Sequence, residues 1–146
     1  MRETKKNDAV LAELERIEET HGGIVTPQAV VEFARDPTTA LHSRFDWEDS
    51  IAAAKWRLEQ ARSILRVAVK YVGEVEKRPI AAFVSLGSDR IRGGGYRSTV
   101  RVLDDDEKRA ELLEQAKREA RAWADRYKEF SELARIRMAI VESLAG

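Results

Sequence analysis

Apolar residues recur at spacings of three and four in the first quarter of the chain, which predicts two short helices joined by a tight turn. The first helix is expected to start after Asn7 or Asp8, because either side chain can cap a helix, and to end at His21-Gly22-Gly23. Thr26-Pro27 predicts the start of the second helix. Residues 7–36 are therefore expected to form a helical hairpin.

The same spacing continues over residues 46–72 and predicts a longer third helix. Asp46 is the expected cap at its start, and Gly73 is the expected end.

The pattern changes to alternation after Pro79. Apolar and polar residues alternate over residues 80–86 and again over residues 96–102, as they do in half-buried strands. The intervening positions 87–95 are rich in glycine and are expected to form a flexible loop. Residues 79–103 are therefore predicted to form a β-hairpin.

Residues 104–144 contain no glycine or proline and are predicted to form one long helix. At 1.5 Å per residue, a helix of about 40 residues would be about 60 Å long, which exceeds the width of a small domain. Part of it is expected to pack on the third helix as a helical hairpin or coiled coil, and part on another element or another copy of the chain. The residues of this expected interface are Leu113, Ala116, Ala120, Trp123, Tyr127 and Phe130.

Together these elements predict an α+β fold that is mainly α, formed by a single domain over residues 1–146. The length of 146 residues and the 43% of hydrophobic residues suit a domain with a core. The absence of cysteine excludes disulfides, a thiol nucleophile and zinc sites built on sulfur. The polar N-terminus and the charges within the apolar stretch of residues 64–72 lead us to expect no targeting signal and no membrane partner.

The chain carries 26 basic and 26 acidic residues, so it is not uniformly basic. The charges are nevertheless unevenly distributed, because residues 78–101 hold five arginines against Asp89 alone, a net charge of +4. Arginines, glycines that approach phosphates closely and a tyrosine that stacks on bases are together typical of nucleic-acid contact. The candidate nucleic-acid-binding residues are Arg90, Arg92, Gly93, Gly94, Gly95, Tyr96, Arg97 and Arg101.

Alternative interpretations remain open for two of these features. The arginines of residues 78–101 can instead pair with acidic helices of the same protein at a mobile hairpin tip. The two N-terminal helices are compatible with a helix-turn-helix, but the exposed face of the second helix offers only one basic residue, Arg35. A helical hairpin that caps the core is the favoured interpretation of that segment.

Catalytic and metal-binding patterns are weak in this sequence. His21 and His42 lie beside turns without a characteristic partner, and no serine occupies a nucleophile elbow. The acidic residues at positions 104–107 are explained by helix capping and the helix dipole, and those at positions 46–49 in the same way. Glycines 93–95 match neither a Walker loop nor a dinucleotide fingerprint. We therefore expect no enzyme activity, no metal and no cofactor.

Several stretches resemble a pattern in small proteins of bacteriophages and prophages. They are residues 23–31 (GIVTPQAVV), 34–37 (ARDP), 41–47 (LHSRFDW), 60–62 (QAR) and 94–97 (GGYR), together with the acidic start of the final helix. The resemblance covers about residues 9–140, and its most specific piece is residues 36–47. It implies a phage origin, and hence the cytoplasm of a bacterial host, without implying any catalytic residue. The resemblance also favours a nucleic-acid or regulatory role, because many small phage proteins have such roles.

The leading hypothesis from the sequence is a non-enzymatic phage-type protein that binds nucleic acid through the arginine-rich hairpin as an oligomer. The alternative is an assembly or adaptor protein that binds another protein through its long C-terminal helix and binds no nucleic acid.

Overall fold

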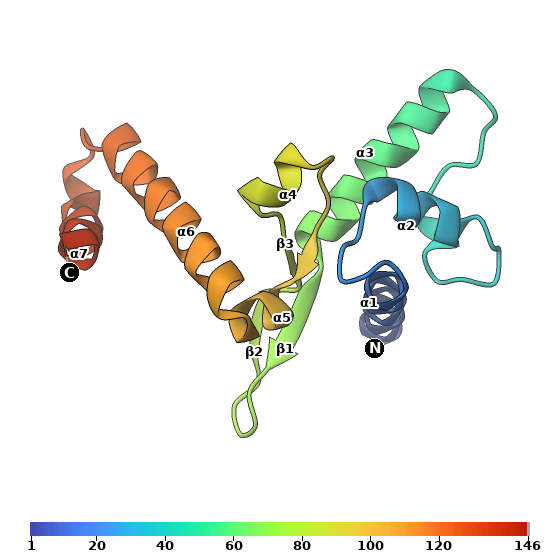
Figure 1. The fold of residues 1–146 in the computed structure, drawn as a ribbon, viewed down its shortest axis with the longest axis horizontal. Helices are drawn as coiled ribbons and strands as arrows, with labels where there is room; N and C mark the ends of the chain where they lie inside the picture. Colours follow the sequence, from blue (N-terminus) through green and yellow to red (C-terminus); the bar gives the residue numbers. More distant parts are fainter. Residues whose placement is uncertain (146) are drawn as a thin grey trace. The chain divides into compact units, whose positions relative to one another are not determined.

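The computed structural model describes residues 1–145 and divides the chain into two compact units, Met1–Leu103 and Asp104–Gly146 (Figure 1). Each unit is described by itself below. Helices dominate, and the strands form two small antiparallel sheets, so the predicted α+β, mainly α fold is confirmed. The expectation of a single domain stays a prediction.

The N-terminal unit begins with α1 (Arg2–Thr20) and α2 (Pro27–Ala34). The predicted start of α2 is confirmed, because the hydroxyl of Thr26 accepts a hydrogen bond from the Ala29 N–H at 3.1 Å and Pro27 occupies the first turn. The predicted start of α1 after Asn7 or Asp8 is wrong. The helix already begins at Arg2, since no glycine or proline interrupts the residues before position 22.

Helix α3 (Ile51–Val67) is shorter at both ends than the predicted helix of residues 46–72. Ser50 caps it in place of Asp46, accepting a hydrogen bond from the Ala53 N–H at 3.0 Å. Beyond Val67 the chain becomes a strand, β1 (Val69–Val72). Its β-branched and aromatic residues fit a strand as well as a helix, and pairing with a second strand decides between the two.

The predicted β-hairpin of residues 79–103 is only partly present. Strand β1 pairs antiparallel with β2 (Arg78–Ala81), and β3 (Phe83–Val84) pairs antiparallel with β4 (Arg97–Ser98). The expected pairing of the two strand segments therefore holds over two residues on each side.

Two short helices replace the rest of the predicted hairpin. They are α4 (Gly87–Ile91), within the predicted loop, and α5 (Thr99–Asp104), where the second strand was expected to continue. The alternation of apolar and polar residues does not predict these helices, because contacts with other elements hold them in place. Asp89 of α4 binds Arg97 of β4, and the Ser98 N–H, just before α5, donates a hydrogen bond to the carboxylate of Glu18 in α1.

The core of the N-terminal unit lies among α1, α2, α3 and β3. Leu14, Val30, Leu41 and Leu65 are fully buried in it. The link between α1 and α2 joins this core to the chain before β4, because Val25 and Tyr96 exchange two backbone hydrogen bonds of 2.7 and 2.8 Å. The short helix η1 (His42–Arg44) lies in the connection between α2 and α3.

The C-terminal unit is a helical hairpin of α6 (Asp106–Arg126) and α7 (Ala134–Ala145), connected through the short helix η2 (Ser131–Leu133). Helix α7 turns back beside α6, as Figure 1 shows. The predicted unbroken helix of residues 104–144 is therefore wrong. The apolar stripe changes direction after Phe130, and folding back lets α7 place its own apolar residues against α6.

Candidate functional site

Arg97, a predicted nucleic-acid contact on β4, is bound within the chain by Asp89 of α4. Its Nε lies 2.6 Å from Asp89 Oδ2 and its Nη2 lies 2.8 Å from Asp89 Oδ1, a two-point ion pair in which the carboxylate is buried. The pair attaches α4 to β4. This arrangement matches the alternative interpretation, in which the arginines pair with acidic residues of the same protein.

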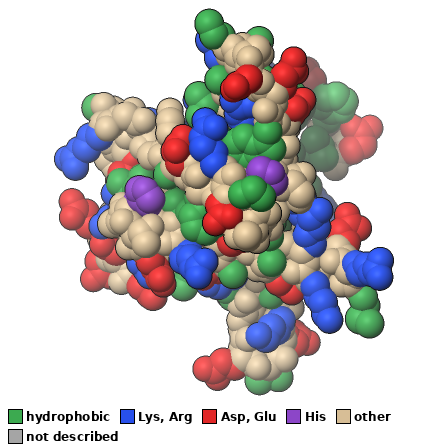
Figure 2. Space-filling view, turned by 90° about the vertical axis from the view of Figure 1, so that its right-hand side faces the viewer, with side chains coloured by type: hydrophobic (Ala, Val, Ile, Leu, Met, Phe, Trp, Pro, Cys, Tyr) green, Lys and Arg blue, Asp and Glu red, His purple; other side chains and the backbone are tan. Residues whose placement is uncertain are grey.

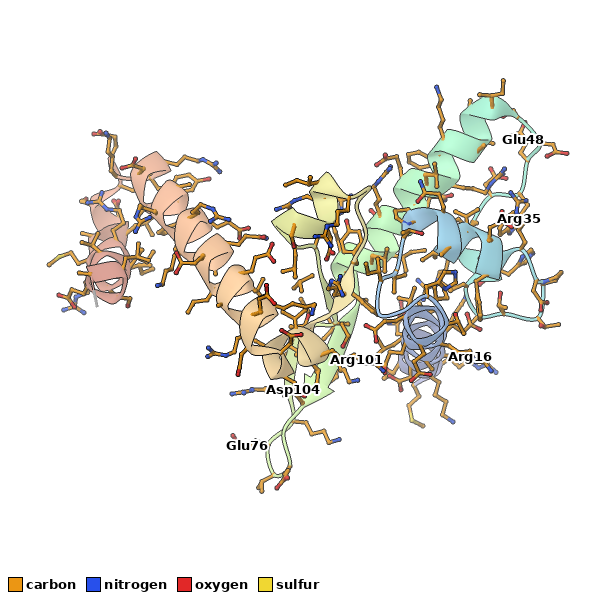
Figure 3. The ribbon with its side chains drawn as sticks, in the orientation of Figure 1. Arg16, Arg35, Glu48, Glu76, Arg101 and Asp104 are labelled. Atoms are coloured by element: carbon orange, nitrogen blue, oxygen red, sulfur yellow. The ribbon has the colours of Figure 1, made fainter. Side chains whose placement is uncertain are left out.

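Arg101 on α5, which is labelled in Figure 3, is also paired. Its partners are two glutamates at the end of α1. Its Nε lies 3.1 Å from Glu18 Oε1, and its Nη2 lies 3.7 Å from Glu19 Oε1. Glu18 is 2% exposed and also accepts a hydrogen bond of 2.7 Å from the Ser98 N–H. Sequence reasoning missed this buried glutamate, although its position four residues after Leu14 places it on the core-facing side of α1.

The three consecutive glycines have different structural roles. A Cβ on Gly95 would lie 2.4 Å from Ile24 Cγ2, so glycine is required there by packing as well as by its φ of +125°. Gly93 and Gly94 have φ of +111° and +84°, and nothing lies within 4 Å of a Cβ added at either position. Of the three, Gly93 and Gly94 therefore have open space beside them, and the N–H of Gly94 is bound to the Asp89 carbonyl at 2.9 Å.

Arg90 and Arg92 of the predicted set are exposed, and Tyr96 packs against the core with its ring partly buried. Tyr96 is therefore not displayed as a platform for an unpaired base. On the face shown in Figure 2, basic and acidic side chains are interspersed, without one broad basic surface. The candidate nucleic-acid arginines thus comprise Arg97 and Arg101, which are bound to carboxylates of α4 and α1, and Arg90 and Arg92, which are exposed at the α4 end.

The predicted interface residues of the C-terminal unit lie on α6 or directly after it. Trp123, Tyr127 and Phe130 form a row of rings whose successive centroids are 5.5 and 6.3 Å apart. Leu113 is 45% exposed and Ala116 is exposed, whereas Ala120 is half-buried. No side chain of residues 104–145 is buried.

A groove of about 370 Å³ runs between α6 and α7. Its apolar lining comes from Ala124, Met138 and Val141, and the two larger side chains are each 62% exposed. Four charged residues of both signs complete the lining: Asp125, Lys128, Arg137 and Glu142. The groove therefore has the character of a protein contact surface, with apolar residues flanked by charges.

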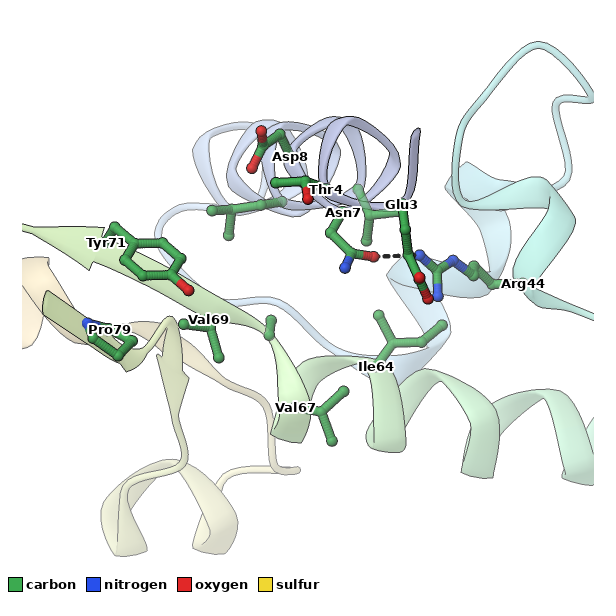
Figure 4. A pocket seen from close by; sticks show the side chains of 13 residues that line it. Glu3, Thr4, Asn7, Asp8, Arg44, Ile64, Val67, Val69, Tyr71 and Pro79 are labelled. Atoms are coloured by element: carbon green, nitrogen blue, oxygen red, sulfur yellow. Dashed lines mark hydrogen bonds between the residues drawn. The ribbon is translucent and has the colours of Figure 1, made fainter. Parts of the chain in front are cut away.

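A second groove, of about 560 Å³, lies in the N-terminal unit between α1, the end of α3 and β1 (Figure 4). Ile64, Val67 and Val69 provide apolar lining, and Arg44 donates a hydrogen bond of 2.7 Å to Asn7 Oδ1 at one side. Its volume is in the range of small-molecule pockets. Polar residues of different kinds line it, among them Glu3, Thr4 and Asp8, and this mixture selects no particular ligand chemistry.

A cluster around Trp47 was not anticipated from the sequence. The guanidinium carbons of Arg35 and Arg57 lie 5.7 and 5.4 Å from the ring centroid, and the His42 ring stacks on Trp47 at 4.9 Å. Arg57 is buried and donates hydrogen bonds to the carbonyls of Asp46 and Glu48. The cluster therefore secures the connection between α2 and α3.

The histidines and acidic clusters have structural partners. His21 Nδ1 lies 2.8 Å from the Ile17 carbonyl, and His42 Nδ1 lies 2.7 Å from the Ala34 carbonyl. The ammonium and N–H of Lys108 bind Asp105, the cap of α6, and hold the pKa of that carboxyl below its usual value. The N–H and hydroxyl of Thr38 likewise lower the pKa of Asp36.

Within residues 1–145, no group of three or more histidines and carboxylates is arranged to hold a metal ion. None of the helices in the same part of the chain is both long and apolar enough to cross a bilayer. No protein-family model, curated protein or solved structure is significantly similar to the chain. The resemblance to small phage proteins therefore stays a prediction, and the site is interpreted from its geometry alone.

Proposed function

We propose that this chain is a non-enzymatic assembly protein that binds another protein chain through the helical hairpin of residues 104–145. One observation carries the proposal: the hairpin presents large apolar side chains to solvent and buries none of its own. The side chains concerned are Leu113, Phe130, Ile136, Met138 and Val141, each about half or more exposed.

The size of the hairpin supports this function. Chains of about 40 residues rarely fold stably without a disulfide, a metal or a partner. This hairpin has no cysteine, and within the described residues no metal-binding cluster. A protein partner that covers the apolar side chains would supply this stability.

Hydrogen exchange of the full chain at nanomolar concentration tests the proposal. Backbone amides of α6 and α7 are expected to exchange much faster than those of α1 and α3, because the hairpin lacks a core of its own. Equal protection of the two units in dilute solution would overturn the proposal, since the hairpin would then need no partner.

Nucleic-acid binding through the α4 end is a second candidate function, which we also propose. It is favoured by exposed Arg90 and Arg92 beside the sterically open position of Gly93. Arg97 is excluded from this surface because Asp89 already binds it on two points.

A fluorescence titration with short single- and double-stranded DNA and RNA at two salt concentrations tests this candidate. Binding that weakens as salt rises and drops in an Arg90→Ala, Arg92→Ala double variant supports it. The matched control is Arg62→Ala, an arginine of α3 outside the candidate surface. No binding even at low salt would contradict it.

A further inference from the structure

The outer edge of β1 carries backbone groups that are free to pair with another strand. Just beyond this strand, the Ala82 N–H donates a hydrogen bond of 2.9 Å to the Ala68 carbonyl. Bonded and non-bonded pairs alternate along an antiparallel ladder, so Val69 and Tyr71, one and three positions further, belong to non-bonded pairs. Their N–H and C=O groups therefore point away from β2, and no hydrogen bond to these groups occurs among residues 1–145.

The outer edge of β2 is closed at the matching position. Pro79 lies opposite Tyr71 and has no N–H, and prolines on an edge strand protect that edge against further pairing. Strand β1 contains no proline, and its sequence of β-branched and aromatic residues favours pairing. A two-stranded ribbon is marginally stable by itself and gains stability from a third strand. The β1–β2 ribbon can therefore accept one more strand, at β1.

Apolar side chains accompany the open edge. Val69 and Tyr71 are 46% and 61% exposed, and Val67 at the end of α3 is 73% exposed. Figure 4 shows Val69 and Tyr71 across the groove of about 560 Å³ from Thr4 and Asp8 of α1. The groove therefore lies beside the strand, where it can receive alternate side chains of an added strand.

We infer that the open edge of β1 and the groove beside it bind an extended segment of a partner protein, which joins the β1–β2 ribbon as a third strand. The inference goes beyond the proposed function, because this surface belongs to the N-terminal unit and involves no residue of the helical hairpin. The mixed polar lining of the groove agrees with a ligand that is held mainly through its backbone, since backbone N–H and C=O groups are the same in every sequence.

The charges of the groove indicate the sequence of the segment. Glu3 and Asp8 line the groove and form no ion pair in the described part of the chain. Arg44, the basic residue of the lining, donates its hydrogen bond to Asn7. We therefore expect a segment with apolar residues at alternate positions and at least one lysine or arginine.

A second copy of β1 fits this edge less well than a different protein does. In the antiparallel register that pairs both outward-facing residues, Val69 lies opposite Tyr71 of the second copy. The two Lys70 side chains then lie directly opposite each other, and like charges at such positions are destabilising. We therefore assign the segment to a partner of different sequence.

Selection from a displayed library of random octapeptides on the immobilised full chain provides a probe. The enriched peptides should carry apolar residues at alternate positions together with a lysine or arginine. Fluorescence anisotropy of one labelled, enriched peptide then measures its Kd for the wild type and for variants of the chain.

The variant Tyr71→Pro removes one outward-facing N–H without removing a hydrogen bond of the ribbon, and it should raise the Kd at least about tenfold. Tyr71→Ala, which removes the ring and keeps the N–H, should raise the Kd less than Tyr71→Pro does. Ala81→Pro is the matched control on the other edge, because Ala81 of β2 lies opposite Val69 in a non-bonded pair. It should leave the Kd within about twofold of wild type. Circular dichroism verifies that each variant is folded.

Methylation of single backbone nitrogens of the peptide tests strand pairing on the wild-type chain, whatever the variants do to folding. Neighbouring N–H groups of a strand point to opposite sides, so only alternate ones face β1. Methylation at these alternate nitrogens should weaken binding at least about tenfold, and methylation at the intervening nitrogens should change the Kd less than about threefold.

Four results would overturn the inference: no enriched peptide, enriched peptides with apolar residues at helical spacings of three and four, a Kd that Tyr71→Pro leaves unchanged, and equal effects of methylation at neighbouring nitrogens. A wild-type dimer that Tyr71→Pro dissociates in sedimentation equilibrium would also overturn it, because the edge would then belong to a second copy. Each of these results leaves the proposed function standing, since that function is tested on residues 104–145.

Discussion

The two units of this protein differ in how far they bury their apolar side chains. The unit of residues 1–103 surrounds Leu14, Val30 and Leu65 completely, and even encloses carboxylates that are satisfied by arginines and backbone N–H groups. The unit of residues 104–145 is as regular in helix but buries no side chain. Helix content alone therefore does not distinguish a unit with a closed core from one whose apolar side chains stay partly exposed.

The largest expected difference between the units comes from truncating a leucine in each. Leu14→Ala should lower the free energy of unfolding of the N-terminal unit by about 3 kcal/mol, because it opens a cavity in a closed core. Leu113→Ala should change stability by less than about 1 kcal/mol, because that side chain is already half exposed. Urea denaturation of the full chain at low concentration measures both. An equal decrease in the free energy of unfolding for Leu14→Ala and Leu113→Ala would contradict this difference between the two units.

Removing a buried ion pair tests how much such pairs stabilise the N-terminal unit. Asp89→Asn should lower the free energy of unfolding by about 2 kcal/mol, because Arg97 loses its two-point partner inside the protein. The control is Glu32→Gln, whose ion pair with Arg35 lies on the surface and should contribute no more than about 0.5 kcal/mol. If Asp89→Asn proved as mild as the control, the ion pair between Asp89 and Arg97 would contribute little to the stability of the N-terminal unit.

The Trp47 cluster tests whether side chains secure connections in the first unit. Arg57→Lys should speed hydrogen exchange over residues 42–49 and lower stability by about 1 kcal/mol, because an ammonium cannot reproduce the planar contact with Trp47 and the two carbonyl hydrogen bonds. Arg66→Lys, an exposed change in the last turn of the same helix, is the matched control. Unchanged exchange over residues 42–49 would argue against this role of Arg57.

The smallest effect concerns the cap of α6 and depends on pH. Because the pKa of Asp105 is lower in the folded protein than its ordinary value of 3.8, its charged form stabilises α6 above that value. This stabilisation should be lost as the pH falls through 3.8 toward the lower folded pKa. Circular dichroism from neutral pH downward should therefore show a step that Asp105→Asn removes and Asp106→Asn retains. A step that survives in Asp105→Asn would assign it to another carboxylate.

Local patterns predicted the elements whose boundaries depend on neighbouring residues. The start of α2 follows from Thr26 and Pro27, because a cap and a first-turn proline act within one turn of helix. The apolar stripe of α6 likewise follows from residue spacing. The stripe changes direction after Phe130, next to the turn that leads into α7.

Elements that depend on distant partners were not predictable in this way. Residues 69–72 form a strand because they pair with residues 78–81. The ion pair between Asp89 and Arg97 attaches α4 to β4. Of the candidate nucleic-acid residues, local composition identified the arginines, but only the fold assigned Arg97 and Arg101 to carboxylates of α4 and α1.

The sequence by itself determined the mainly helical class, the neutral but unevenly distributed charge, and the apolar face of the last helix. These properties depend on residue type and spacing, which act over a few positions. Only the tertiary structure decided which charges are already paired and which apolar residues remain uncovered. Both depend on contacts between residues far apart in the chain, as the bond from Ser98 to Glu18 illustrates.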